Sequence, residues 1–198
     1  MRKIVTLLLF AISLSACVGH KQSSVITETE LDSEPRIIRF LPEMLQGYRY
    51  EDYENYGGNL GYSLRYRKEN EPYHMADFFI WPVSKEALKY PHKDIVFSVA
   101  DGSLQDIYSA QDAGLYNKVE VLESNAYDTN GKILVVTKLS MLRDNLSSLS
   151  YLVVTEHRGK YIKARASFAD NSANRERGDI AVFLVDFINQ IIRNIENA

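Results

Sequence analysis

The stretch that decides the fold is LSYLVVTEHRGKYIKARASF, residues 149–168. Two runs rich in strand-forming residues, 149–156 and 161–168, flank a short polar segment that contains Gly159, and this pattern is typical of a tight β-hairpin. Side chains of a strand point alternately to its two faces. In the returning strand one face carries Ile162, Ala164, Ala166 and Phe168, and the other carries Tyr161, Lys163, Arg165 and Ser167.

A second hairpin lies immediately before the first. Residues 116–127 and 132–143 are joined by Asp128-Thr129-Asn130-Gly131, and Asn-Gly between apolar runs strongly favours a two-residue turn. The runs Leu134–Val136 and Leu152–Val154 are apolar at consecutive positions. Both faces of these strands therefore need cover, which predicts a helix layer on each side of the sheet.

Two segments have the spacing of such helices. Residues 93–113 place apolar side chains three and four positions apart, but Gly102 costs about 1 kcal/mol in a helix interior, so we expect a helix that is kinked or split there. Residues 179–196 form an amphipathic helix whose polar residues argue against a membrane span. Its apolar stripe consists of Ile180, Phe183, Leu184, Phe187, Ile188, Ile191 and Ile195.

The first half of the chain adds further strands. We expect a strand at 36–41, a tyrosine-rich hairpin at 47–56 and 62–68, and a strand at 75–83 whose apolar run suggests cover on both faces. The predicted fold is α+β. A mostly antiparallel sheet of about six or seven strands forms a three-layer α/β/α sandwich in the order βββ-α-ββββ-α.

The element order resembles that of the PsbP/Mog1-type sandwich. So do the strand end Phe79-Ile80-Trp81-Pro82 and the hairpin Tyr151-Leu152-Val153-Val154-Thr155 with Gly159-Lys160-Tyr161-Ile162-Lys163. The resemblance covers residues 36–196, and the fold also occurs in small bacterial lipoproteins. It implies a binding or accessory protein rather than a catalyst, and it carries no residue roles over to this chain.

The N-terminus carries a signal of its own. Arg2 and Lys3 precede an apolar run, residues 4–14, that is too short to span a bilayer. Leu14-Ser15-Ala16-Cys17 then resembles a bacterial lipobox, which implies cleavage between Ala16 and Cys17 and acylation of Cys17. Ordinary cleavage after Ser15, which would leave a soluble periplasmic protein, is the alternative.

The lipobox divides the chain into three parts. Residues 1–16 are the signal peptide, 17–35 are the acylated cysteine and a polar tether, and 36–198 are a single α+β domain. Two acyl chains suffice for stable membrane attachment. Val18 is not the aspartate associated with inner-membrane retention, so we expect the periplasmic face of the outer membrane.

Composition excludes several classes of partner. Removal of residues 1–16 takes Arg2 and Lys3 from the 23 basic residues and none of the 26 acidic ones, which leaves a net charge of −5. With no basic block, nucleic acid is not expected as a partner. Cys17 is the only cysteine, so neither a disulfide within the chain nor a cysteine metal site is expected.

Motifs for catalysis are missing from the sequence. It contains no Gly-x-Ser-x-Gly, no glycine-rich phosphate loop and no His-Glu-x-x-His. The four histidines, His20, His74, His92 and His157, have no neighbours at metal-ligand spacing. We therefore expect no cofactor, no metal and no catalytic residue.

The tyrosines of the first hairpin have two interpretations. Cross-strand aromatic packing is the first, and we favour it. The second is a recognition surface, because tyrosine is enriched in protein interfaces. The candidate binding face consists of Tyr48, Tyr50, Tyr62, Tyr66 and Trp81.

Together these features predict a non-catalytic, lipid-anchored binding or accessory protein that faces the periplasm and contacts another envelope protein. An immunity or inhibitor lipoprotein directed against a toxin or hydrolase is one alternative. An enzyme that acts on cell-wall or lipid substrates, with a site assembled only by folding, is another.

Overall fold

The computed structural model describes residues 41–45, 47–57, 60–69, 74–129, 131–170 and 179–197. All of them belong to one compact unit, Pro35–Ala198. The elements are β1 (Met44–Leu45), β2 (Tyr48–Asn55), β3 (Tyr62–Lys68), β4 (Met75–Pro82), the 3₁₀ helix η3 (Ala87–Lys89), α2 (His92–Asp112), β5 (Lys118–Thr129), β6 (Lys132–Arg143), β7 (Leu146–His157), β8 (Lys160–Ala169) and α4 (Asp179–Asn197).

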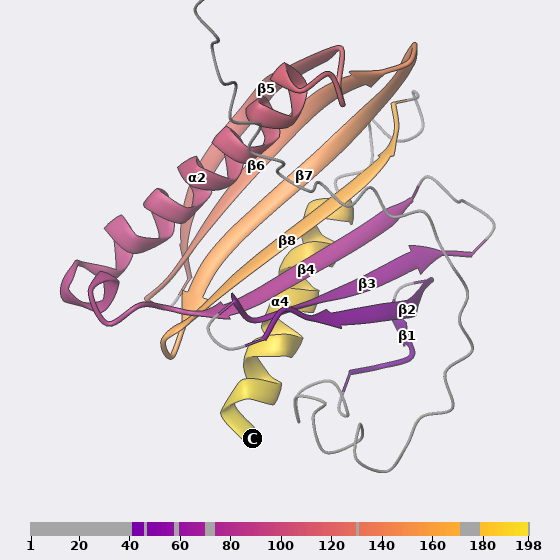
Figure 1. Cartoon of the computed structure of the whole chain (residues 1–198). Coiled ribbons are helices and arrows are strands. Elements are labelled where there is room, and N and C mark those ends of the chain that lie inside the picture. The colour runs from indigo at the N-terminus through magenta and orange to yellow at the C-terminus, as the bar shows by residue number, and fades with distance from the viewer. Residues whose placement is uncertain are drawn as a thin grey trace, which may run out of the picture. The chain divides into compact units, whose positions relative to one another are not determined.

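The strands form one antiparallel sheet in the order β1-β2-β3-β4-β8-β7-β6-β5 (Figure 1). After β4 the chain crosses through α2 to the far edge, and three hairpin turns then return it until β8 pairs with β4. Apart from the two-residue β1, the sheet has seven strands, and the predicted order of elements is confirmed. The strand predicted at 36–41 lies outside the described residues except for Leu41.

Helix α4 covers one face of the sheet. Its buried side chains Leu184, Phe187 and Ile188 pack against alternate residues of β3, β4, β7 and β8. The ring of Phe187 stacks on Phe78 of β4, with the ring centroids 3.8 Å apart. This cluster is the larger half of the core, and burial of each such side chain contributes about 1.5–3 kcal/mol.

Helix α2 covers part of the other face. Val96, Ala100 and Ile107 pack on β5, β6 and β7, where they contact Leu152, Val154 and their neighbours. Leu152 and Val154 therefore face α2, whereas Val153 faces α4. This alternation confirms that the apolar runs of the central strands mark a three-layer sandwich.

Helix α2 is continuous across Gly102, so the predicted split is wrong. Glycine lowers the helix propensity at this position. Residues before and after it, including Ala100 and Ile107, are buried in the same cluster, and this packing stabilises both halves of the helix.

The expectation that the strand at 75–83 is covered on both faces is also wrong. Ala76, Phe78 and Ile80 are buried under α4, but Phe79 and Trp81, which point the other way, are only half-buried. A helix about 10 Å wide covers two or three strands spaced about 4.8 Å apart. Helix α2 lies mainly over β5 to β7 (Figure 1). On that side β4 meets α2 only near its end, where Trp81 packs against the cluster of Val83, Ile95 and Tyr161.

Replacement of glycine by alanine should have opposite effects on stability at two positions, Gly61 and Gly102. Gly61 has a φ of +77°, and an added Cβ would overlap the carbonyl oxygen of Ile80 and lie 2.6 Å from Cβ of Trp81. A Cβ at Gly102 would meet nothing within 4 Å. We expect Gly61→Ala to destabilise the protein by at least about 2 kcal/mol and Gly102→Ala to stabilise it by about 1 kcal/mol.

Urea unfolding followed by circular dichroism measures both changes, and each variant serves as the control for the other. Equal stability of Gly61→Ala and the unmodified protein would show that the chain does not need glycine where β3 begins beside β4.

Candidate functional site

The tyrosines of the first hairpin lie mainly inside the protein. Tyr66 has no exposed surface and Tyr48 only 6%, and both belong to the cluster under α4. Tyr50 and Tyr62 are half-buried against the same cluster. Tyr48 and Tyr66 therefore cannot form part of an exposed binding face, because their side of the sheet is the side that α4 covers.

Trp81, the fifth residue of that candidate face, lies on the opposite side of the sheet. It belongs to an area that we call the open face, which is the part of the α2 side beyond the main contact of α2 with β5 to β7. Trp81 lies at the border of this area, where it packs against the cluster of Val83, Ile95 and Tyr161. The open face consists of half-buried side chains from β3, β4 and β8: Arg65, Arg67, Met75, Asp77, Phe79, Trp81 and Lys163.

The centre of the open face is a lysine held between aromatic rings. Nζ of Lys163 lies 4.8 Å from the ring centroid of Phe79 and 5.7 Å from that of Trp81, within the range of cation–π attraction. Trp81 in turn packs on Tyr161, with the centroids 5.2 Å apart. Burial lowers the pKa of Lys163, and the carboxylate of Asp106 on α2 acts in the opposite direction.

Ion pairs border this centre on the side of β3. Nε of Arg65 donates to Oδ1 of Asp77 at 2.7 Å, and Nε of Arg67 donates to Oε1 of Glu51 at 2.9 Å. These side chains are between 24% and 40% exposed, so each pair contributes little stability. Their effect is to present ordered charges of both signs beside the aromatic centre.

Arg165 marks the boundary between the open face and the area under α2. Its Nε donates to Oγ of Ser150 at 3.1 Å, and its Nη2 donates to the hydroxyl of Tyr116 at 3.3 Å. The guanidinium is thus directed toward the far end of α2, and Lys163 is the cation that remains at the centre of the open face.

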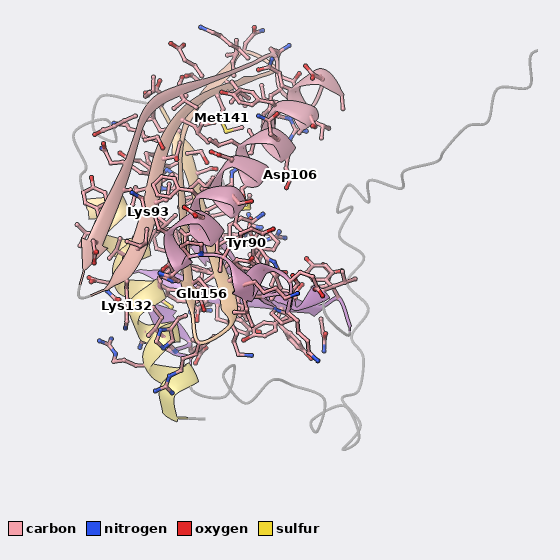
Figure 2. All side chains as sticks on the ribbon, turned by 90° about the vertical axis from the view of Figure 1, so that its left-hand side faces the viewer. Tyr90, Lys93, Asp106, Lys132, Met141 and Glu156 are labelled. Atoms are coloured by element: carbon pink, nitrogen blue, oxygen red, sulfur yellow. The ribbon has the colours of Figure 1, made fainter. Side chains whose placement is uncertain are left out.

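A hollow of about 400 Å³ adjoins the open face near the start of α2. We call it the Tyr90–Tyr161 hollow, and its lining residues are Ala87, Tyr90, Asp94, Ile95, Ser98 and Tyr161. Beside it, Nε2 of His92 lies 2.7 Å from Oε2 of Glu156. Figure 2 shows Tyr90 and Glu156 near the first turns of α2 and Asp106 farther along the helix.

A second hollow, of about 260 Å³, lies on the α4 side of the sheet near the edge strand β5. It is lined by Leu122, Lys138, Ser140, Leu149 and Asp170. Nζ of Lys138 lies 5.6 Å from the ring centroid of Tyr151. Neither hollow has a histidine in its lining.

The three described histidines belong to different elements of the fold. His74 is 5% exposed and packs edge-on against Phe168 in the core. His92 is the first residue of α2, and His157 ends β7. In the described part of the chain, no three histidine, cysteine, aspartate or glutamate side chains are grouped so that they could hold a metal ion.

The membrane signal predicted from Leu14-Ser15-Ala16-Cys17 lies outside the described residues, as does His20. Among the helices that the structure does describe, none combines the length and the apolar character needed to cross a bilayer.

Comparison with known proteins shows the fold alone. No family model and no curated protein matches the chain. The solution structure of cyanobacterial PsbP (CyanoP) from Synechocystis sp. PCC 6803 superimposes with a TM-score of 0.53 at 16% identity, over 71% of this chain and 80% of that chain. A Pseudomonas aeruginosa protein of unknown function, PA94, gives a TM-score of 0.36 at 13% identity, over 71% and 81%. The PsbP-like fold expected from the sequence is therefore confirmed.

The buried tyrosines make stability depend on alkaline pH. Burial raises the pKa of Tyr66 and of Tyr62 well above the usual value near 10. Above pH 10 the unfolded chain loses these protons and the folded chain keeps them, so the folded state binds more protons and its stability falls as pH rises.

We expect the free energy of unfolding of Tyr66→Phe to fall less steeply than that of the unmodified protein as pH rises from about 10 to 12. At neutral pH the same variant loses about 1 kcal/mol, because the hydroxyl of Tyr66 donates to the carbonyl oxygen of Pro42 at 2.9 Å. Thermal unfolding measured at a series of pH values tests both statements. Tyr127→Phe, at a position on β5 that is 52% exposed, controls for the loss of one hydroxyl. An identical pH dependence in Tyr66→Phe and the unmodified protein would contradict the argument.

Proposed function

We propose that this chain is a non-catalytic, lipid-anchored binding or accessory protein of the bacterial envelope, which contacts another envelope protein through its open face. The observation that carries the proposal is the half-buried centre formed by Lys163, Phe79 and Trp81. Aromatic residues, methionine and arginine are enriched in protein interfaces, and the open face carries all three kinds around this centre: Phe79, Trp81, Met75, Arg65 and Arg67. The opposite face of the same strands is packed beneath α4. On this side Trp81 packs against the cluster of Val83, Ile95 and Tyr161 near the start of α2. The side chains of Lys163, Phe79 and Trp81 all remain half-buried.

The anchor part of the proposal rests on the sequence. Leu14-Ser15-Ala16-Cys17 places the lipid on Cys17, and the polar residues 18–35 hold the domain away from the bilayer. The domain can then meet a partner in the periplasm.

Two other functions remain as alternatives with distinct outcomes. As an immunity or inhibitor lipoprotein, the chain would lower the activity of a toxin or hydrolase bound at the open face. As an enzyme of cell-wall or lipid substrates, it would turn over substrate without a protein partner. The open face favours a binding function because its described side chains are engaged with one another in ion pairs and ring contacts.

Substitution of the acylated residue tests the anchor. We expect Cys17→Ala to abolish lipidation and to move the protein from the membrane fraction to the soluble fraction or to leave it as uncleaved precursor. Ser15→Ala is the control, because a small residue remains at that lipobox position and membrane attachment should persist. The measurement is fractionation followed by mass determination of the mature N-terminus. Unchanged membrane attachment of Cys17→Ala would contradict the lipobox.

Site-specific photocrosslinking in intact cells tests the open face. A photoreactive residue in place of Met75, at the margin of the open face, should give one discrete crosslinked protein. The same residue in place of Tyr127, which is exposed on β5, is the control and should not give that product.

In this assay we expect Trp81→Ala to lower the crosslinked yield by at least about tenfold, because aromatic residues at the centre of an interface typically contribute about 2 kcal/mol or more. Equal yields from the two positions, or an unchanged yield in Trp81→Ala, would exclude the open face as the contact surface. Turnover of a cell-wall or lipid substrate without any crosslinked partner would favour the enzyme.

A further inference from the structure

The Tyr90–Tyr161 hollow combines two aromatic rings with a single carboxylate. Tyr90 follows η3 and is 66% exposed, whereas Tyr161 begins the returning strand β8 and is 8% exposed. Ala87 and Ile95 complete the apolar lining, and Asp94 and Ser98 from α2 supply the polar atoms. A volume of about 400 Å³ lies within the range of sites that hold small organic groups.

The charge of this hollow is negative. Asp94 is its one ionisable acid, and it forms no ion pair with any residue that the structure describes. Burial raises the pKa of Tyr161, and the charge of Glu156 raises it further, which places a second carboxylate within electrostatic range. Tyr161 thus stays neutral, and the field around its ring favours a cation.

The basic residues next to Asp94 in sequence are directed elsewhere. Nε2 of His92 contacts Glu156, and Nζ of Lys93 lies 5.6 Å from the ring centroid of Phe97. The position of Asp94 in the first turn of α2 is itself favourable, because the helix dipole stabilises a carboxylate there. The dipole does not account for the two rings that face the same space.

This combination selects one class of ligand. Aromatic rings and a carboxylate together attract an organic cation, through the ring faces and through charge-assisted hydrogen bonds. An anion would be repelled by Asp94. A purely apolar group would bury that carboxylate without a partner, which is costly.

The hollow is continuous with the open face through one ring contact. Tyr161 lines the hollow and also packs on Trp81, at a centroid distance of 5.2 Å. A protein seated on the open face would therefore have side chains within reach of the hollow.

We propose that the Tyr90–Tyr161 hollow binds the guanidinium or ammonium side chain of an arginine or lysine carried by the protein partner of the open face. This inference rests on the proposed function, since it assigns a positive charge to the side chain of the partner that enters the hollow. Asp94 pairs with the cation, and the rings of Tyr90 and Tyr161 enclose its aliphatic stem.

The test uses arginine and its uncharged analogue. N-acetyl-arginine amide is titrated into the isotope-labelled full chain in detergent micelles, and the backbone amide signals of Tyr90 and Ser98 are followed by NMR. N-acetyl-citrulline amide has nearly the same shape but no charge, and we expect it to bind at least tenfold more weakly.

Asp94→Asn removes the charge with little change in shape, and we expect it to weaken binding of the arginine amide about tenfold. Asp101→Asn is the matched control, because Asp101 is exposed on the same helix and does not line the hollow. We expect its affinity to stay within twofold of that of the unmodified protein. Equal binding of the arginine and citrulline amides, or equal effects of the two substitutions, would overturn the proposal.

The outcomes separate this inference from the proposed function. If the crosslinked partner persists but the arginine amide does not bind, the hollow is not a cation site and the open face still stands. If the amide binds in a manner that depends on Asp94 but Met75 captures no partner, the inference of a partner side chain is overturned and the hollow is a site for a free organic cation.

Discussion

The pairing of β4 with β8 is the constraint on which the rest of the structure depends. Each half of the sheet is built from local hairpins, and among the described strands this is the one ladder that joins the two halves. Its register sets Phe78 opposite Ala164 and Phe79 opposite Lys163. The first pair faces α4, where alanine leaves room for the stacked rings of Phe78 and Phe187, and the second pair faces the side of α2. A shift by one residue would place Lys163 in the core beneath α4, so the register is strongly specified.

The same ladder explains why the sheet has an open face. The strands twist and number eight, and one helix of 21 residues cannot cover them all on one side. Helix α2 follows the crossover to the far edge and packs mainly over β5 to β7, so only its first turns reach the ends of β4 and β8. Full exposure of Phe79 and Trp81 to water is avoided because Lys163 lies near both rings and Trp81 also packs on Tyr161. The result is a half-buried surface of rings and charges beside the area that α2 covers.

Much of the fold could be predicted from the sequence because its signals are local. Asn130-Gly131 and Gly159 mark hairpin turns, and the consecutive apolar residues 152–154 indicate cover on both faces. The errors have non-local causes. Gly102 does not interrupt α2, because the helix is held by packing on the sheet, and residues 75–83 are apolar although only one side lies beneath a helix.

For the candidate site, the sequence identified Trp81, whereas it did not identify Lys163 and Asp94. The polar face of the returning strand contained a signal for Lys163. No sequence signal could indicate the Tyr90–Tyr161 hollow, because its lining comes from three elements separated by as many as 74 positions along the chain, from Ala87 to Tyr161.

The sequence by itself therefore determined the order of elements and the two apolar faces of the central strands, because each depends on residues close together in the chain. The lipid signal at Cys17 stays a prediction from the sequence. Only the tertiary structure decided which face of the tyrosine hairpin is buried. Alternation along β3 shows that Tyr62, Leu64 and Tyr66 share a side, but it does not show which side meets a helix. The helix that meets it is α4, more than 110 positions later in sequence, and its docking removes Tyr66 from solvent while it leaves Trp81 and Lys163 at the surface.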